Sequence, residues 1–468
     1  MRRLMMTLFA AVAVSSGVAQ GQSPNVVIFY ADDMGIGDVG CYGCMDIRTP
    51  NIDALARTGV RFTHYYSAAP ICSPSRAALV TGRYPHRAGV PTNVSSLMGK
   101  PGMPPEQITF AELAKTVGYA TGLVGKWHLG SDYRTQANAQ GFDYFFGYHA
   151  CIDYWSHMFY YGGNVPHYHD LYRNREEIFE NGKYVTHLIT REATRFIDDH
   201  KNGPFLLYVP FHAPHYPTQA PVYLMDMYKH LPRKRQLYAA LVAGMEESIG
   251  RIVDRLRYHK LIADTLVFFM SDNGASVESR ANGGGGSNGP FRGHKFSLFE
   301  GGIRMPAVVS WPGRIPQNQT RDQLAIAIDV LPTIAEAIGA KIPAGHAVDG
   351  RSWMPLFADA GAPGHETLFW EWNKQHAVRQ GKWKVVRNGL IDLHMSKWDR
   401  AQGDDAVFLS NLEADPGETT NLRHQHPELA ARLLKRHDAW LEDVSRPVPR
   451  PDETRHDSNQ KRPEAPSG

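Results

Sequence analysis

Two apolar segments that end in acidic residues and glycine constrain the fold of this chain most strongly. Residues 26–30 form an unbroken apolar run that is followed by ADDMG, and residues 265–274 (TLVFFMSDNG) repeat the pattern. Continuous apolar runs without polar alternation are typical of strands in a parallel sheet, because such strands are buried on both faces. The pattern therefore predicts two central strands of a parallel sheet.

Strand-like and helix-like segments alternate along most of the chain. Similar apolar runs recur at residues 120–124 and 205–209. Amphipathic stretches with helical spacing occupy residues 49–58, 109–116, 184–199 and 235–257. This alternation predicts the α/β class, with a large, mostly parallel sheet flanked by helices. A length of 468 residues, 43% of them hydrophobic, allows one large domain and a smaller one, or two to three domains.

The pattern changes near residue 363. Short aromatic runs with partial alternation follow (TLFWEW, HAVRQGKWKVVR and AVFLSNL), and then a helical stretch over residues 427–444. Such runs, joined by turn residues, predict a small antiparallel sheet with one helix. We therefore expect a large domain over residues 22–362, a small α+β subdomain over 363–445, and a disordered tail rich in proline and charge over 446–468.

The first 21 residues have the features of an export signal. Two arginines precede an apolar stretch from Leu4 to about Val14, and small residues suited to cleavage follow near residues 19–21. The apolar stretch is too short to cross a membrane, so no membrane anchor is expected. We therefore expect bacterial export of the protein, to the periplasm or the medium.

Charge and cysteine content limit the remaining possibilities. The 50 basic and 47 acidic residues are interspersed and give a net charge of +3, which argues against a nucleic-acid partner. Cys41 and Cys44 form a CxxC pair that could be a local disulfide, a redox pair or half of a zinc site, although no second pair completes a zinc site. If Cys72 has a chemical role, at most one disulfide can form among Cys41, Cys44 and Cys151.

The segment ICSPSRAALVTGR predicts a helix with a cysteine at its N-terminus. Ser73 suits the N-cap, Pro74 suits the first helical position, and Gly82 suits the end of the helix. Cys72 would then lie at the positive end of the helix dipole. Arg76, four residues further on, would point toward the same end. Backbone N–H groups and a guanidinium together favour a bound anion there.

CSPSRAALVTGR resembles the signature of the formylglycine-dependent (type I) sulfatases, an arylsulfatase-like family of the alkaline phosphatase superfamily. The resemblance extends from residue 24 to about residue 421. It implies that a formylglycine-generating or anaerobic maturation enzyme oxidises Cys72 to formylglycine (3-oxoalanine). It also implies that one hydroxyl of the hydrated aldehyde attacks sulfur, and that the other expels sulfate by re-forming the carbonyl.

Oxygen-bearing side chains follow the two strands described first. Asp32 and Asp33 follow one strand, and Asp272 and Asn273 follow the other. The side chains can converge, because an open α/β sheet builds its sites beyond the carboxyl ends of the strands. Oxygen donors favour calcium or magnesium over zinc. ADDMG and SDNG are similar to the metal motifs of the family, which implies that these four residues and modified Cys72 bind Ca²⁺, or alternatively Mg²⁺.

Three further motifs supply cations and histidines. GKWHLG contains Lys126 and His128, PFHAPH contains His212, and GHKFSLFEGGIRMP contains Lys295. Lysines can hold the oxygens of a sulfate ester while a histidine protonates the leaving alcohol. By the resemblance, Lys126 and Lys295 bind sulfate together with the catalytic Arg76. His128 would orient the aldehyde hydrate, and His212 would be the acid.

Residues 141–173 are dense in tyrosine, phenylalanine, tryptophan and histidine. Such a segment can line a sugar-binding mouth, with His149 as a candidate substrate contact, or it can pack on the sheet edge. The resemblance implies hydrolysis of sulfated carbohydrates and of aryl sulfates. The alternatives are a phosphonate or phosphate ester hydrolase of the same superfamily and an inactive protein that binds sulfated glycans. A pure binding protein needs neither a nucleophile nor an acid, so we favour the sulfuric ester hydrolase.

Overall fold

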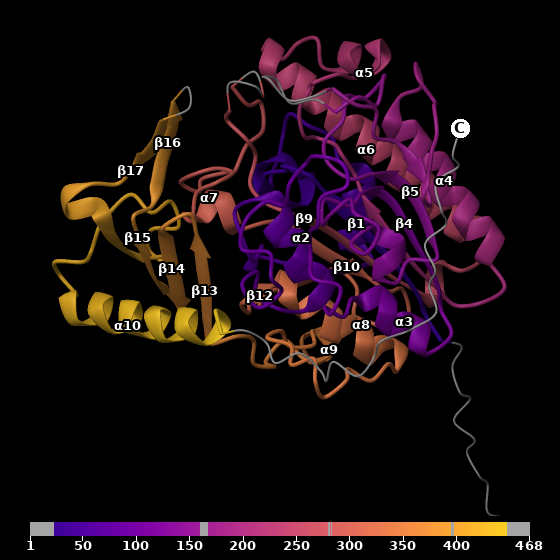
Figure 1. Cartoon of the computed structure of the whole chain (residues 1–468). Helices are drawn as coiled ribbons and strands as arrows, with labels where there is room; N and C mark the ends of the chain where they lie inside the picture. The colour runs from indigo at the N-terminus through magenta and orange to yellow at the C-terminus, as the bar shows by residue number, and fades with distance from the viewer. Residues whose placement is uncertain (1–22, 160–166, 279–280, 282, 395–396, 447–468) are drawn as a thin grey trace, which may run out of the picture.

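The computed structural model describes residues 23–159, 167–278, 281, 283–394 and 397–446 (Figure 1). The expected export signal, and all of the expected tail after residue 446, lie outside these ranges. Among the helices of the described chain, none combines the length and the apolar character needed to cross a membrane.

Within the described residues, a ten-stranded mixed sheet forms the centre of the larger body, in the order β11-β2-β10-β9-β1-β8-β4-β5-β6-β7. Its strands are β1 (Asn25–Ala31), β2 (Gly59–Phe62), β4 (Ala120–Lys126), β5 (Tyr144–Tyr148), β6 (Tyr172–Arg173), β7 (Glu176–Glu177), β8 (Phe205–Pro210), β9 (Thr265–Ser271), β10 (Ala307–Ser310) and β11 (Gln319–Arg321). A separate pair is formed by β3 (Tyr65–Tyr66) and β12 (Ala325–Ile326).

The strands predicted from apolar runs form the middle of this sheet. β1 pairs in parallel with β8 on one side and with β9 on the other, and β4 pairs in parallel with β8. Every residue of β1, β8 and β9 is buried. The α/β prediction is confirmed, and the sheet is mixed because β10 runs antiparallel to both β9 and β2.

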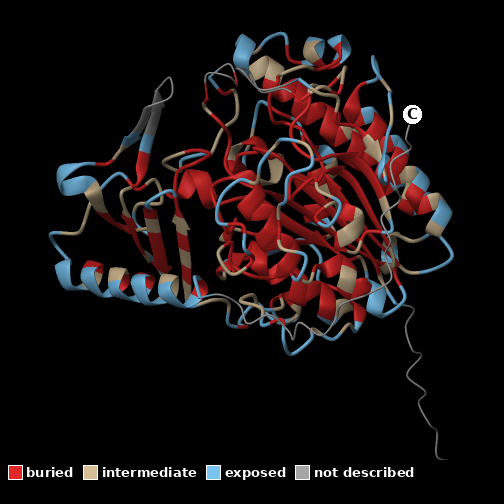
Figure 2. Cartoon of the chain, in the orientation of Figure 1, coloured by how far each residue is buried: buried red, intermediate tan, exposed pale blue. Residues whose placement is uncertain are grey.

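Helices cover both faces of the sheet, because alternate residues of each strand point to opposite sides. Val26 and Ile28 pack in one apolar cluster with α2, α3 and α8, whereas Val27 and Phe29 pack in the other with α1, α4 and α6. Figure 2 shows the buried sheet between the two helical layers. The helices of this body are α1 (Pro50–Arg57), α2 (Cys72–Thr81), α3 (Phe110–Thr116), α4 (Val185–His200), α5 (Val222–Met227), α6 (Arg233–Tyr258), α8 (Val330–Ile338) and α9 (Met354–Ala358).

The smaller body contains the antiparallel sheet and the helix expected near the C-terminus. The sheet consists of β13 (Thr367–Trp372), β14 (Gln375–Gln380), β15 (Trp383–Arg387) and β18 (Val407–Asn411), and the helix is α10 (Pro427–Val444). Leu368 and Trp370 face the larger body, whereas Val378 and Val385 pack against α10. An additional hairpin, β16 (Leu390–His394) and β17 (Lys397–Arg400), was not expected. The short helix α7 (Glu300–Ile303) lies between the two bodies (Figure 1).

Candidate active site

The oxygen-bearing side chains that follow β1 and β9 meet at one edge of the sheet. The backbone N–H of Asp33 donates to Oδ1 of Asp272 at 3.1 Å, and Nδ2 of Asn273 donates to Oδ1 of Asp33 at 2.7 Å. Asp32 lies in the same group, and all four side chains are buried. Asp33 has a φ of 64°, a left-handed conformation that is uncommon for a residue other than glycine and is often found at functional sites. The structure thus brings together the four residues predicted from the strand ends.

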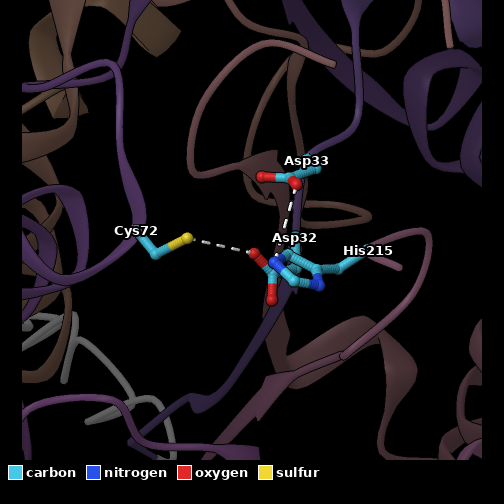
Figure 3. A group of neighbouring side chains, drawn as sticks. All are labelled: Asp32, Asp33, Cys72 and His215. Atoms are coloured by element: carbon cyan, nitrogen blue, oxygen red, sulfur yellow. Dashed lines mark hydrogen bonds and ion pairs between the residues drawn. The ribbon is translucent and has the colours of Figure 1, made fainter. Parts of the chain in front are cut away.

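This group has the donor chemistry of a divalent cation site. Oδ1 of Asn273 is buried and has no hydrogen-bond partner among the described residues, although the amide nitrogen of the same side chain is bonded. Ligand atoms of Asp32, Asp33, Cys72 and His215 all lie within 4.8 Å of one another (Figure 3). Carboxylate and amide oxygens suit calcium or magnesium. His215 is an unexpected member, with Nε2 3.7 Å from Oδ2 of Asp33.

Cys72 is the first residue of α2, so the prediction that Ser73 is the N-cap is wrong. The N-cap is Ile71, which offers no side-chain acceptor. Oδ1 of Asn93 accepts the Ser73 N–H at 3.0 Å instead, from a loop twenty residues further along the chain. Gly82 ends the helix in a left-handed conformation, as predicted. Sγ of Cys72 lies 3.5 Å from Oδ1 of Asp32.

Three buried cations pair with the three carboxylates. Nζ of Lys126 lies 2.6 Å from Oδ2 of Asp32, and Nζ of Lys295 lies 2.8 Å from Oδ2 of Asp33. Nη2 of Arg76 lies 2.8 Å from Oδ2 of Asp272. Arg76 therefore reaches across to the acidic group, and it does not merely border the beginning of its own helix.

Burial and neighbouring charges shift the pKa values of Cys72 and of the nearby aspartates. Burial raises the pKa of the Cys72 thiol well above its usual value, although Lys126 and Lys295 oppose this change. Burial also raises the pKa of Asp272, and the nearby charge of Asp32 raises it further. Burial and the charge of Asp32 likewise raise the pKa of Asp33, whereas Lys126 and the other nearby cations outweigh burial at Asp32 and hold its pKa well below its usual range. A divalent cation at this position would relieve the mutual repulsion of the carboxylates.

Two of the predicted histidines follow strands of the same sheet. His128 follows β4 with a φ of 55°, and its buried Nδ1 has no hydrogen-bond partner in the described chain. His212 follows β8, and neither of its ring nitrogens meets hydrogen-bond geometry with another described group. The ring of His212 packs against Tyr148 and Tyr154, with centroids 5.5 and 4.8 Å away. Burial lowers the pKa of His212 to about 3, so the free protein holds it neutral.

Sequence reasoning missed two members of this site. His215 is the second histidine of PFHAPH, so the signal was present, but only the first histidine was chosen. Its Nδ1 lies 2.6 Å from the Tyr216 carbonyl, which can only accept a hydrogen bond, so Nε2 carries the lone pair. Sγ of Cys151, shortly after β5, lies 3.9 Å from that Nε2. Cys151, unlike His215, belongs to none of the motifs that carry the family resemblance.

The remaining candidate, His149, directly follows β5. The His149 ring bonds to Asp170, with Nδ1 3.0 Å from Oδ1, and packs against Tyr172, while its buried Nε2 has no hydrogen-bond partner among the described residues. None of the four cysteines, all of which lie in the described residues, forms a disulfide. Cys41 and Cys44 line different surface hollows, one beside Arg61 and one beside Arg235, which argues against the local disulfide.

Comparison with known proteins identifies the family. Residues 24–340 match the family model described as sulfatase, and residues 290–442 match the model described as N-sulphoglucosamine sulphohydrolase, C-terminal. N-acetylgalactosamine-6-sulfatase of Mus musculus is 34% identical over 455 residues, which cover 92% of this chain and 82% of that protein. Steryl-sulfatase of Homo sapiens is 34% identical over 424 residues, covering 74% of this chain and 72% of that protein.

A solved structure agrees with the sequence matches. The protein Ps i-CgsB, solved in complex with k-i-k-neocarrahexaose, superimposes with a TM-score of 0.79 at 30% identity, covering 90% of this chain and 94% of that chain. The family match, the named relatives and the shared sheet architecture together show that this chain is a sulfatase, a member of the sulfatase family in the alkaline phosphatase superfamily.

Proposed function

We propose that this sulfatase removes sulfate from sulfated carbohydrates, and also accepts aryl sulfates, by using formylglycine formed from Cys72. The observation that carries this proposal is the meeting of Cys72 with the acidic residues after β1 and β9 and with three buried cations. Cys72, the precursor of the nucleophile, therefore lies next to both the acidic residues that can bind a metal cation and the basic residues that can bind sulfate. A formylglycine hydrate supplies a nucleophile that can afterwards release sulfate without attack of water on sulfur.

We further propose that Asp32, Asp33, Asp272 and Asn273, with residue 72, hold Ca²⁺ or alternatively Mg²⁺. The three carboxylates and the unpartnered Oδ1 of Asn273 support this assignment. A divalent ion supplies positive charge for binding a sulfate oxygen. His215 Nε2 faces Asp33 and would border the same ion.

The other residues of the site have roles that follow from their charge. Lys126, Lys295 and Arg76 would hold the sulfate oxygens, because buried cations interact strongly with anions in a site that excludes water. His128 would orient the residue 72 side chain. His212 would protonate the leaving oxygen, and the negative charge of a bound sulfate ester favours its protonated form.

The substrate class rests on the relatives and on the position of the smaller body. One relative is described as an N-acetylgalactosamine-6-sulfatase, and one solved neighbour holds a carrahexaose. In this chain, Trp372 of β13 packs in one apolar cluster with Ile71 and Phe296, which are sequence neighbours of Cys72 and Lys295. The smaller sheet therefore packs against the two segments that carry Cys72 and Lys295. We also propose export directed by residues 1–21.

Matched esters of one phenol test the reaction class. We expect the matured protein to hydrolyse 4-nitrophenyl sulfate with a kcat/KM at least about 100-fold above that for 4-nitrophenyl phosphate. Each of the three buried cations is already paired with a carboxylate, so the site offers limited net positive charge and suits the singly charged sulfate ester better than the doubly charged phosphate ester. Sulfate release from a panel of defined sulfated saccharides, measured by ion chromatography, then tests the substrate class. Faster cleavage of the phosphate ester would identify a phosphatase, and cleavage of aryl sulfate alone would reject the carbohydrate assignment.

Removal of the cation tests the acidic site. We expect exhaustive chelation to lower activity at least about 100-fold and Ca²⁺ or Mg²⁺ to restore it, since oxygen ligands select these ions. Asp33→Ala should lower both bound metal, measured by elemental analysis, and kcat. Asp254→Ala, which changes an exposed carboxylate paired with Arg257, is the matched control. Restoration by Zn²⁺ alone would argue against an oxygen-ligand site.

A further inference from the structure

A fully buried group of charges joins the smaller sheet to the larger body. We name Glu300, Lys384 and Glu418 the junction cluster, and each has 0% of its surface exposed. Nζ of Lys384 lies 2.9 Å from Oε1 of Glu300 and 3.2 Å from Oε1 of Glu418. Oε2 of Glu418 accepts the backbone N–H of Glu300 at 2.6 Å. Lys384 therefore binds two carboxylates at once, across the boundary between the two bodies.

Other polar groups complete the surroundings of Glu300. Its Oε2 accepts the Tyr66 hydroxyl at 2.6 Å and lies 3.4 Å from Nη1 of Arg304, and Arg379 lies 3.8 Å away. Burial alone would raise the pKa of Glu300, but Lys384 and the two arginines together lower it to about 2. Glu300 is therefore a charged carboxylate, and both of its oxygens have hydrogen-bond or ion-pair partners.

Stability alone does not account for such a cluster. Removing charges from water costs several kcal/mol for each ion, and replacing a buried ion pair by apolar residues is often neutral or stabilising. A buried charge network does, however, fix geometry, because each of its members accepts only particular partners and directions. The question is which part of the molecule needs that fixed geometry.

The segment from Arg292 to Gly302 carries both Lys295 and Glu300. Glu300 is the first residue of α7 and lies five residues after Lys295. The segment folds back on itself, with the Gly301 N–H donating to the Arg292 carbonyl at 2.7 Å. Lys295 in turn donates its backbone N–H to the Ala275 carbonyl at 3.2 Å. A shift of Glu300 would therefore move the chain that carries Lys295.

The same segment also touches the loop that carries the acidic residues. The Gly274 N–H donates to the Gly302 carbonyl at 3.1 Å, directly after Asn273. A Cβ on Gly274 would lie only 2.0 Å from the Gly301 carbonyl oxygen, so the two backbones are in closest contact there. Little room is left for one loop to move without the other, because packed interiors transmit small displacements.

We infer that Lys384 and Glu418 of the smaller body are positioning residues that act through Glu300 to hold Lys295 in place for sulfate binding. This inference rests on the role proposed above for Lys295. It assigns the smaller body a part in the chemistry of the larger one, since Lys384 comes from β15 and Lys295 from the edge of the site.

A double-mutant cycle tests the inference with 4-nitrophenyl sulfate as substrate. Lys295→Ala should lower kcat/KM at least about 100-fold, because it removes a buried cation that faces the anion. Lys384→Met, which keeps the length of the side chain, should lower kcat/KM about 10- to 100-fold, because small misplacements of reacting groups are costly. The double variant should be no worse than Lys295→Ala by more than about twofold, since a residue that acts through Lys295 has no effect once Lys295 is gone.

The outcomes separate the inference from the function on which it rests. If Lys295→Ala leaves kcat/KM unchanged, the proposed role of Lys295 is wrong, and the inference falls with it. If Lys295→Ala is damaging but the two losses multiply in the double variant, Lys384 supports the fold in general and only the inference is wrong.

Two further variants control for the loss of a lysine in general and for misfolding of Lys384→Met. Lys382→Met alters an exposed lysine in the turn just before β15 and should change kcat/KM by no more than about twofold. If Lys384→Met does not fold, Glu418→Gln replaces it in the cycle, because the amide oxygen can still accept the Glu300 N–H while the charge is lost. Failure of both variants to unfold cooperatively would show that the cluster serves the fold alone.

Discussion

Replacement of Cys72 by alanine should lower sulfate release by at least about 10³-fold while the protein stays folded, since loss of a catalytic nucleophile removes most of the rate enhancement. The residue is 1% exposed and its sulfur lies beside Asp32, so the change deletes one sulfur atom and its contact. The midpoint of thermal unfolding should therefore move by only a few degrees. Ester hydrolysis and thermal unfolding, measured on the same preparation, check both expectations.

Mass spectrometry of the peptide that contains residue 72 tests whether Cys72 is converted to formylglycine. In active protein we expect the peptide that carries residue 72 to have lost the mass of a thiol and gained an aldehyde. Cys72→Ser should be inactive in a host that modifies only cysteine. Cys44→Ala, at a half-buried thiol next to Asp46, is the matched control and should retain activity within about twofold. Full activity with unmodified cysteine at residue 72 would rule out the proposed nucleophile.

The central parallel strands could be read from the sequence, but the direction of the short strand β10 could not. β1, β8 and β9 are continuous apolar runs because they are buried on both faces, and this burial is what the sequence pattern reports. β10 has only four residues, and nothing in the run AVVS indicates whether it lies parallel or antiparallel to β9. Its direction depends on the neighbouring strands, which is a property of the assembled sheet.

The site shows the same division between local and long-range information. The convergence of Asp32 with Asp272 follows from two strand ends in a parallel sheet, so the sequence sufficed. The Asn93 side chain that caps α2 comes from a separate loop, and therefore leaves no signature near Ser73. The pair of Lys384 and Glu300 joins residues that are 84 positions apart. Contacts of this kind depend on tertiary packing and have no local pattern.

The two histidines of PFHAPH should respond differently to substitution. His212→Ala should lower kcat about 10²–10⁴-fold on a sulfated sugar but less than about tenfold on 4-nitrophenyl sulfate, because general acid catalysis matters least when the leaving oxygen is already stable. Among the described residues, the ring nitrogens of His212 have only a contact with the Tyr216 backbone that falls short of hydrogen-bond geometry, whereas His215 bonds to the Tyr216 carbonyl at 2.6 Å and faces Asp33. The structure therefore leaves His212 better able than His215 to meet a leaving group.

His215→Ala is the matched comparison, since it changes the same residue type three positions along the same buried segment. We expect His215→Ala to lower kcat/KM by similar factors on both substrates, because a residue next to the acidic group acts on sulfate binding whatever the leaving group is. Initial rates on both esters, with metal content measured for each variant, separate the two roles. Equal losses for His212→Ala on the two substrates would show that His212 binds sulfate. A selective loss on the sugar for His215→Ala would then make His215 the acid.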